Sequence, residues 1–301
     1  MEVGMVGLGR MGGNMATRLV RGGHRVVGYA RSRDTVDAAV KNGVVGAYSL
    51  AELVRGLRPP RAVWLMIPAG APTEAMIDAL IPLLAAGDLL IDGGNTYYRD
   101  SIRHAQKVAA QGLKFLDVGT SGGIWGLQEG YSMMVGGAAD DVARVRPALE
   151  TLAPAPDAGW GHVGGIGAGH FVKMVHNGIE YGLMQSYAEG FAILKAKPDY
   201  PIDLEQVAHV WQRGSVVRSW LLDLIAAALQ DPVALQHLAP YVQDSGEGRW
   251  TVKEAIDLDV PAPVITIALE QRLRSREADP FAEKLLAAMR QQFGGHAVKT
   301  E

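Results

Sequence analysis

The sequence predicts a two-part fold, in which an α/β half is followed by an all-helical half. Two observations predict it. Up to residue 152, short apolar runs alternate with helical patterns; beyond a proline-rich break at residues 153–156 and one further short run, every candidate segment is helical. A chain of 301 residues is long enough for two domains of ordinary size. We expect an α/β domain over residues 1–163 and a helical domain over residues 164–301.

The α/β half is built from short apolar runs of strand length, each followed by a helical pattern. We expect strands at residues 3–8, 25–29, 62–67, 88–92, 114–118, 131–135 and 159–163. We expect helices between them at residues 10–21, 33–41, 73–84, 99–110 and 140–152. Apolar runs of this length that alternate with helices are typical of parallel βαβ units with right-handed crossovers.

The helical half begins with an unusually long helical pattern at residues 167–194. Shorter helices are expected at residues 204–213, 217–229, 251–258, 264–275 and 280–293. Neither half contains a sequence repeat or a low-complexity tract.

Composition excludes several classes of protein. Lys and Arg number 29 against 32 Asp and Glu, so the net charge of −3 gives no broad reason to bind nucleic acid or an anionic membrane. The lack of cysteine excludes a disulfide framework, a cysteine nucleophile and thiolate zinc sites. No apolar stretch approaches the roughly 18 residues of a membrane helix, and no export signal precedes the first apolar run. We therefore expect a cytoplasmic protein.

The first strand leads into a glycine-rich loop of the form G-x-G-x-x-G. Its residues are Gly7, Leu8, Gly9, Arg10, Met11 and Gly12. Between a strand and a helix, such glycines allow a tight turn and let backbone N–H groups and the helix dipole bind a pyrophosphate. An ordinary strand–helix turn is the alternative. Because the second strand also follows in register, we favour a Rossmann-type domain that binds a dinucleotide.

The end of the second strand indicates which dinucleotide is bound. NAD sites usually carry Asp or Glu there for the ribose 2′-hydroxyl, whereas this chain has Ala30, Arg31, Ser32 and Arg33. A guanidinium and a hydroxyl could instead bind a 2′-phosphate through charge-assisted hydrogen bonds. We favour NADP over NAD, although these arginines could also simply begin a solvated helix.

The long helix carries a stripe of polar residues along one face. Lys173, His176, Asn177, Glu180 and Tyr181 fall at positions i, i+3, i+4, i+7 and i+8. An amphipathic helix with its polar face in water is the simpler interpretation. However, Lys173 and Glu180 are two turns apart, which is not the spacing of a surface ion pair. A lysine with a lowered pKa can accept a proton near neutral pH, so we favour a catalytic face.

Four blocks of sequence resemble the decarboxylating 6-phosphogluconate dehydrogenases. The most specific is HFVKMVHNGIEYG at residues 170–182; the others are DGGN at 92–95, GTSGG at 119–123 and GEGRWT at 246–251. They cover nearly the whole chain in the family's order. The chain is shorter than the long-chain enzymes and so resembles the short-chain branch of the β-hydroxyacid dehydrogenase superfamily. That superfamily generally lacks the run HNGIEY.

The resemblance implies a role for each matching residue. Lys173 would be the general base at the C3 hydroxyl, and Glu180 the acid that protonates the product carbon after loss of CO2. It also implies a pentose phosphate pathway reaction with NADP or NAD and no metal. The substrate-binding residues implied by the resemblance are Asn95, Ser121, Gly122, Gly123, Lys173, His176, Asn177, Glu180, Tyr181, Arg272, Arg290 and His296. Asn95 would also contact the cofactor, together with Ile67, Pro68 and Ala69.

The C-terminal tail bears on the assembly. In the long-chain family, the tail that corresponds to residues 290–296 comes from the partner subunit, which implies a homodimer or homotetramer. A frayed terminus is the alternative.

Two departures from the family leave alternatives open. Ser245 stands where the long-chain enzymes have a phosphate-binding lysine, which makes unphosphorylated gluconate a possible substrate. Pro68 replaces a lysine near the cofactor and weakens the preference for NADP. A β-hydroxyacid dehydrogenase acting on a small 3-hydroxy acid is the rival enzyme. A non-catalytic dinucleotide sensor is a remote third reading, because it would not need a matched base and acid.

Overall fold

The computed structural model describes residues 1–294, 297 and 299. The chain forms two compact units, Met1–Asn177 and Gly178–Glu301, which are called the first and the second unit below. The long helix α8 (Ala168–Ala196) begins in the first unit and continues into the second. The predicted domain boundary at residue 163 follows the change from mixed to helical elements, and it stays a prediction.

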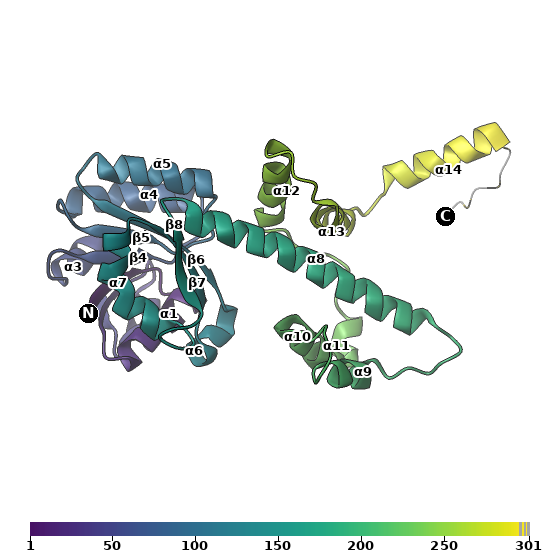
Figure 1. Cartoon of the computed structure of the whole chain (residues 1–301), viewed down its shortest axis with the longest axis horizontal. Helices are drawn as coiled ribbons and strands as arrows, with labels where there is room; N and C mark the ends of the chain where they lie inside the picture. Colours follow the sequence, from purple (N-terminus) through teal and green to yellow (C-terminus); the bar gives the residue numbers. More distant parts are fainter. Residues whose placement is uncertain (295–296, 298, 300–301) are drawn as a thin grey trace. The chain divides into compact units, whose positions relative to one another are not determined.

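The first unit is built on one mixed sheet, which has eight strands in the described part of the chain (Figure 1). The strand order is β3-β2-β1-β4-β5-β6-β7-β8. The strands are β1 (Glu2–Val6), β2 (Arg25–Tyr29), β3 (Val45–Ala47), β4 (Ala62–Leu65), β5 (Leu89–Asp92), β6 (Lys114–Ser121), β7 (Ser132–Gly137) and β8 (Trp160–Gly164). The chain order reverses between β1 and β4, and ligands of open α/β sheets bind at the carboxyl ends of the strands at such a point.

Helices cover both faces of this sheet (Figure 1). One apolar layer holds side chains from α1 (Arg10–Arg21), α2 (Arg33–Val40) and α7 (Ala139–Leu152). The other holds side chains from α3 (Leu50–Arg55), α4 (Ala71–Leu80) and α5 (Tyr98–Ala109). Successive residues of β4 alternate between them, with Trp64 in the first layer and Val63 and Leu65 in the second. This double coverage explains why the strands are apolar throughout.

The expected pattern of parallel βαβ units does not hold at β7. Strand β7 pairs antiparallel with β6, with Val118 opposite Val135, whereas β8 runs parallel to β7. The connection between β6 and β7 contains only the single-turn elements η2 (Gly123–Trp125) and α6 (Gly126–Glu129). A parallel neighbour needs a crossover of about a dozen residues or more, usually a helix, so this short connection returns the chain in the opposite direction.

Several short elements escaped the sequence patterns. Strand β3 and helix α3 are too short to show a clear period. The helix predicted over residues 73–84 is α4 followed by the 3-10 turn η1 (Ile81–Leu83). Strand β6 continues to Ser121, beyond the predicted end at residue 118. Helix α12 (Glu247–Asp257) begins four residues before the predicted start, directly after Gly246, whose φ of 96° lies in the left-handed region.

The second unit is helical, as the sequence predicts. Besides the later part of α8, it contains α9 (Leu204–Trp211), α10 (Trp220–Leu229), α11 (Pro232–Gln236), α12, α13 (Pro263–Arg274) and α14 (Phe281–Gly294). Two small apolar clusters stabilise it, one around Phe191 and Leu222 and one around Tyr181 and Leu269. Within residues 1–294, 297 and 299, no helix is long and apolar enough to cross a membrane.

Candidate active site

The glycine-rich loop has the conformation that its sequence pattern predicts. Gly7 has a φ of 95°, and a Cβ there would lie 2.3 Å from the carbonyl oxygen of Met66. A Cβ on Gly12 would lie 1.9 Å from the carbonyl oxygen of Gly7. Both glycines are therefore required by contacts within the protein.

Gly9 differs, because no atom of the described residues lies within 4 Å of the position of its Cβ. Its φ of −66° is one that any residue adopts, so neither packing nor backbone conformation requires a glycine here. It is also the N-cap of α1, whose first turn carries no acidic side chain. Open space in front of a helix N-terminus fits a pyrophosphate, and these residues therefore suit a dinucleotide.

At the end of β2, the two arginines have different environments. Arg31 is exposed and makes no hydrogen bond or ion pair with any described residue. Arg33 lies 4.4 Å from the centroid of the Tyr48 ring, and the Tyr48 hydroxyl donates a 2.6 Å hydrogen bond to Asp37. The side chain of Ser32, the N-cap residue of α2, makes no capping hydrogen bond. Arg31 and Ser32 are thus available to a ligand, whereas Arg33 already has a partner.

The loops after β4 and β5 carry the other predicted cofactor residues. After β4, Thr73 of α4 donates a 2.9 Å hydrogen bond to the carbonyl of Pro68 and so holds the turn of Ile67, Pro68 and Ala69. After β5, the buried carboxylate of Asp92 accepts hydrogen bonds from the Gly94 N–H, at 3.1 Å, and from the Thr96 hydroxyl, at 2.8 Å. This turn leaves the intervening Asn95 exposed.

The Ser-Gly-Gly loop follows β6 directly. Ser121 is the last residue of the strand, and Gly122 and Gly123 both have positive φ, of 135° and 53°. The side chain of Asn14, on α1, lies 3.4 Å from the carbonyl oxygen of Ile124 and donates to it. This contact ties the loop to α1, the helix that follows Gly9.

The start of α8 is anchored to the sheet through Asp117 of β6. The Asp117 carboxylate is buried and accepts hydrogen bonds from the backbone N–H of Gly167, at 2.7 Å, and of His170, at 2.9 Å. Backbone contacts here are so close that a Cβ on Gly119 would lie 2.3 Å from the Cβ of Lys173. Lys173 therefore lies directly over Gly119 of β6, and Gly119 is two residues before Ser121 in that strand.

Contacts with α5 support the same turn of α8. The Ser101 hydroxyl lies 2.6 Å from Nδ1 of His170, which is buried, and the rings of Tyr98 and Phe171 meet edge to face at 5.2 Å. Strand β6 leads into the Ser-Gly-Gly loop and α5 follows the Asn95 turn, so the first turn of α8 is fixed to the two elements that carry these loops.

The polar stripe of α8 faces inward, contrary to the interpretation as a solvated face. Lys173 is 5% exposed and Asn177 is 9% exposed, whereas the apolar Ile179 is 52% and Leu183 is 47% exposed. His176 is half-buried, with Nδ1 3.0 Å from the side-chain oxygen of Asn177. Burying a lysine and an amide while exposing isoleucine and leucine opposes the usual preference of these side chains.

In the second unit, Tyr181 and Arg272 lie in contact. The Arg272 guanidinium lies 3.5 Å from the centroid of the Tyr181 ring, and the Tyr181 hydroxyl lies 3.4 Å from the hydroxyl of Ser245. A Cβ on Gly248 would lie 2.4 Å from the Tyr181 ring, which explains a glycine in the GEGRWT block. Glu180 is half-buried on the same helix.

The structure does not bring every predicted residue into a cluster. Arg290 is exposed on α14, and His296 lies outside the described residues. Among the described residues, no group of three or more His, Cys, Asp or Glu side chains could hold a metal ion.

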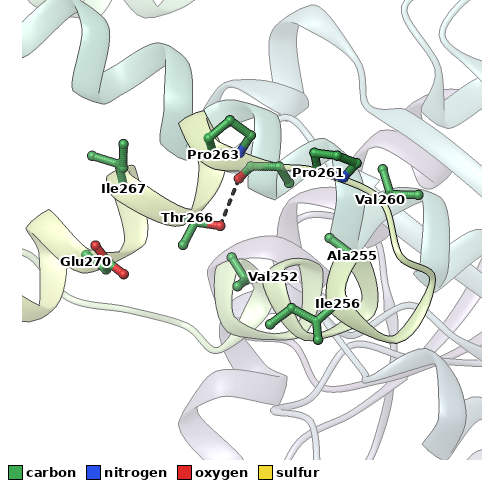
Figure 2. A pocket seen from close by; sticks show the side chains of 10 residues that line it. Val252, Ala255, Ile256, Val260, Pro261, Pro263, Thr266, Ile267 and Glu270 are labelled. Atoms are coloured by element: carbon green, nitrogen blue, oxygen red, sulfur yellow. Dashed lines mark hydrogen bonds between the residues drawn. The ribbon is translucent and has the colours of Figure 1, made fainter.

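A hollow of about 480 Å³ lies between α12 and α13 (Figure 2). Its lining is mostly apolar, with Ile256 and Val260 on one side and Ile267 on the other. Among the described residues that line it, Glu270 alone is charged. It contains none of the predicted site residues. An apolar lining does not suit a polyhydroxylated acid, so we do not assign the substrate to it.

Sequence patterns missed the residues that hold the site together. Asp117 and Asp244 each organise partners more than 45 positions away, and Ser101 contacts His170 across 69 positions. The glycines at 119, 136 and 169 were the available signal, because a close helix–strand approach requires them.

A dinucleotide-type loop in an eight-stranded α/β unit, joined by a lysine-bearing helix to a helical unit, defines the class of NAD(P)-dependent dehydrogenases. Comparison with known proteins narrows the class. Residues 2–164 match the family model for the NAD binding domain of 6-phosphogluconate dehydrogenase. Residues 169–283 match the model for the 6-phosphogluconate dehydrogenase C-terminal domain.

Individual relatives agree with these models. The chain is 42% identical over 299 residues to the NAD(+)-dependent, decarboxylating 6-phosphogluconate dehydrogenase of Haloferax volcanii. The matched region covers 99% of this chain and 98% of that protein. It is 38% identical over 287 residues to the NADP(+)-dependent, decarboxylating enzyme of Bacillus subtilis, covering 91% of this chain and 61% of that protein. The structure of Plasmodium falciparum 6-phosphogluconate dehydrogenase matches with a TM-score of 0.85 at 28% identity, over 100% of this chain and 66% of that one.

The chain belongs to the decarboxylating 6-phosphogluconate dehydrogenase family, among its short members. The resemblance inferred from the sequence blocks is therefore confirmed. The family makes the chain an NAD(P)-dependent oxidoreductase, while the two relatives differ in which dinucleotide they use.

Proposed function

We propose that the protein oxidises and decarboxylates 6-phosphogluconate to ribulose 5-phosphate and CO2, with reduction of NAD(P). The observation that carries this proposal is the inverted burial of α8. Lys173 and Asn177 are buried on a helix that leaves Ile179 and Leu183 exposed. Packing alone favours the opposite arrangement, so the polar face is retained for chemistry.

Lys173 and Glu180 carry the proton transfers of this reaction. Lys173 accepts the proton of the C3 hydroxyl, and NAD(P), when bound, supplies the acceptor for the C3 hydride. The resulting 3-keto acid loses CO2, and the electron pair of the broken bond delocalises onto the C3 oxygen, which protonated Lys173 stabilises by a hydrogen bond. Glu180 then protonates the carbon that becomes C1 of the product.

The remaining residues hold the substrate. Asn95, Ser121, the two glycines after it, His176 and Asn177 bind the hydroxyls and the carboxylate, and Tyr181 and Arg272 bind the phosphate. The exposure of Asn95 and the positive φ of Gly122 and Gly123 support this, because they leave polar groups and backbone accessible. Arg290 and His296 complete the set of substrate-binding residues when the C-terminal tail lies against a substrate site.

We propose NADP as the preferred cofactor. Arg31 and Ser32 are available after β2, and positions 30–32 carry no carboxylate that would oppose a 2′-phosphate. Pro68 lacks the charge of the lysine that it replaces, so Arg31 is the main cation for this group.

Replacement of Arg31 tests the cofactor assignment. The variant R31A should raise the KM for NADP about tenfold or more, because it removes a charge-assisted hydrogen bond, and should leave the KM for NAD nearly unchanged. Steady-state rates with both cofactors measure this. R33A is the matched control with a smaller expected effect, since Arg33 stacks on Tyr48. An equal rise in both KM values for R31A would exclude a 2′-phosphate contact.

Turnover tests the reaction itself. Initial rates with 6-phosphogluconate should be accompanied by stoichiometric release of CO2 with at least one dinucleotide. K173M should reduce kcat by several orders of magnitude and leave the Kd of the dinucleotide, measured by fluorescence, within about twofold. Comparable turnover in K173M would remove Lys173 from its role. Turnover of gluconate or a small 3-hydroxy acid without CO2 would instead favour the rival dehydrogenase.

A further inference from the structure

Ser245 stands where the long-chain enzymes have a phosphate-binding lysine, so one positive charge that could bind the substrate phosphate is missing from this position. Ser245 carries no cation, and of the proposed phosphate residues Tyr181 and Arg272 only the arginine is charged. The inference below concerns this subsite and rests on the proposed function.

Asp244, next to Ser245, is the buried centre of an ionic cluster whose arginines are partly exposed. Its side chain is 3% exposed. It accepts a 2.8 Å hydrogen bond from the Gly246 N–H, a 3.3 Å hydrogen bond from the Tyr181 hydroxyl and a short one from Nε of Arg249. Burial raises the pKa of the Asp244 carboxyl. The Gly246 N–H, Arg249 and Arg276 together lower it by more, so this pKa is below its ordinary value.

Two further arginines are fixed beside Asp244 by neighbouring carbonyl groups. Arg272 donates through Nη1 to the carbonyl of Gln243 at 3.0 Å, and Arg276 donates through Nε to the carbonyl of Val242 at 3.0 Å. The two guanidinium groups therefore bind successive residues of the segment that leads to Ser245. Ser275 strengthens this link, because its hydroxyl accepts a 3.0 Å hydrogen bond from the Val242 N–H.

Arg276 retains a donor that the protein does not use. Its Nη2 is buried and has no hydrogen-bond partner among the described residues; its nearest acidic oxygen, on Asp244, is 3.9 Å away. Arg272 has a similar surplus, since among the residues that the structure describes its Nη2 donates only to the weakly accepting sulfur of Met184, at 3.4 Å. A buried N–H without an acceptor is unfavourable, and a ligand oxygen would satisfy it.

The balance of charge favours an anion. Asp244 pairs with Arg249 through a short hydrogen bond and with Arg276 at 3.9 Å, so a single carboxylate stands beside the three guanidinium groups of Arg249, Arg272 and Arg276. Guanidinium groups bind phosphate oxygens through paired N–H donors. The hydroxyls of Tyr181 and Ser245, 3.4 Å apart, add neutral hydrogen-bonding groups to the same cluster.

We infer that Arg276 replaces the missing lysine and, with Arg272 and Tyr181, binds the phosphate group of the substrate. Asp244 is a positioning residue in this subsite, because it holds Arg249 and the Tyr181 hydroxyl without contacting the phosphate. Arg276 follows the end of α13, and its guanidinium lies 3.9 Å from the carboxylate of Asp244, the neighbour of Ser245 in the chain.

Steady-state kinetics of full-length variants test this inference. R276A should raise the KM for 6-phosphogluconate about 10- to 100-fold, with kcat and the KM for the dinucleotide within about threefold. R276K, which keeps the charge but loses the paired donors, should recover part of the affinity. Inorganic phosphate, used as a competitive inhibitor, should lose affinity in parallel with the substrate.

R274A is the matched control. Arg274 lies two residues earlier and pairs with Glu277 and Glu283, so its loss should change none of these constants. An unchanged KM in both R276A and R276K would overturn the inference, as would an equal loss of affinity for substrate and dinucleotide, which would indicate a structural role.

Calorimetry separates this inference from the proposed reaction. If the wild-type protein binds 6-phosphogluconate more tightly than gluconate and R276A loses that preference, the subsite stands even without turnover. If the wild type binds both acids equally, the subsite is absent and the inference fails.

Discussion

At the scale of single residues, Gly9 and Gly12 show that one motif contains positions with different purposes. Gly12 is needed because a side chain would collide with the backbone of Gly7, whereas Gly9 faces open space. Lys173 shows a related contrast, because its burial disfavours a charged side chain unless the site uses it. No contact within the protein explains the glycine at position 9, whereas a bound dinucleotide would.

The two glycines make a matched pair of variants. G12A should lower stability by about 1–3 kcal/mol, because the new methyl group meets a carbonyl oxygen at 1.9 Å and the loop must shift. G9A should leave the melting temperature within about 1–2 °C but raise the KM for the dinucleotide at least tenfold, since the methyl group enters the space kept for pyrophosphate. Thermal unfolding and steady-state kinetics measure both effects. A large loss of stability in G9A with an unchanged KM would contradict the ligand interpretation.

At the scale of elements, α8 is positioned by its first turn. Asp117 accepts two backbone N–H groups there, and Gly119 lets the helix approach β6 closely enough for Lys173 to lie over the strand. Helices α4 and α5, on one face of the sheet, are joined by charges instead: Glu74 contacts Arg103, His104 and Lys107.

Removal of the Asp117 carboxylate should affect both folding and catalysis. D117A leaves two N–H groups at the start of α8 without their acceptor, so we expect a loss of roughly 1–3 kcal/mol and a lower kcat. Urea unfolding and initial rates report the two effects. S49A is the control: Ser49 caps α3 through the Glu52 N–H, and its loss should cost about 1 kcal/mol without changing kcat. A D117A variant with normal kcat would show that this anchor is not needed to place Lys173.

The stability that the ion pairs of Glu74 contribute between α4 and α5 should depend on pH. Hydrogen bonds from Lys107, Arg103 and His104 lower the pKa of Glu74 to about 2, against an ordinary 4.5. Its contribution to stability is therefore complete above pH 4.5 and declines as the pH falls toward 2, because the unfolded carboxyl is protonated first. Screening at this partly exposed group limits the contribution to about 1 kcal/mol.

The variant E74Q measures this contribution. Its urea midpoint should lie below that of the wild type at pH 7, and the gap should narrow between pH 4.5 and 3. E150Q, which removes one surface ion pair with Arg146, is the control. A gap that stays constant down to pH 3 would mean that the carboxylate is not what holds the helices together.

At the scale of the whole molecule, apolar side chains are distributed unevenly. The first unit buries two large layers on its sheet, whereas the described helices of the second unit leave Ile193, Phe281 and Leu286 exposed. Extensive exposed apolar surface is typical of contact sites between proteins. This supports the proposed homodimer or homotetramer, in which a second copy covers these helices.

Self-association should be visible in hydrogen exchange. As the protein concentration rises, sedimentation should give a mass of two or four chains, and the amides of α8 and α14 should gain protection while those of β4 and β5 remain unchanged. Replacement of Leu286 by aspartate should shift the equilibrium toward the single chain. A single-chain mass at all concentrations would contradict the assembly.

Much of the fold could be predicted because its signals are local. The loop at residues 7–12, the strands of the α/β half and the period of α8 each depend on neighbouring residues, and the structure confirms these elements. The direction of β7 could not be predicted, because it depends on the length of a connection in which the helices are single turns.

The site divides in the same way. The sequence by itself determined the fold class, the family and the polar stripe of α8, because each depends on residues that are contiguous or regularly spaced in the chain. Only the tertiary structure decided that this stripe is buried, that Asp117 anchors it and that Arg276 lies beside Asp244. The physical reason is that burial and hydrogen bonding join side chains dozens of residues apart, and no local pattern records which distant groups meet.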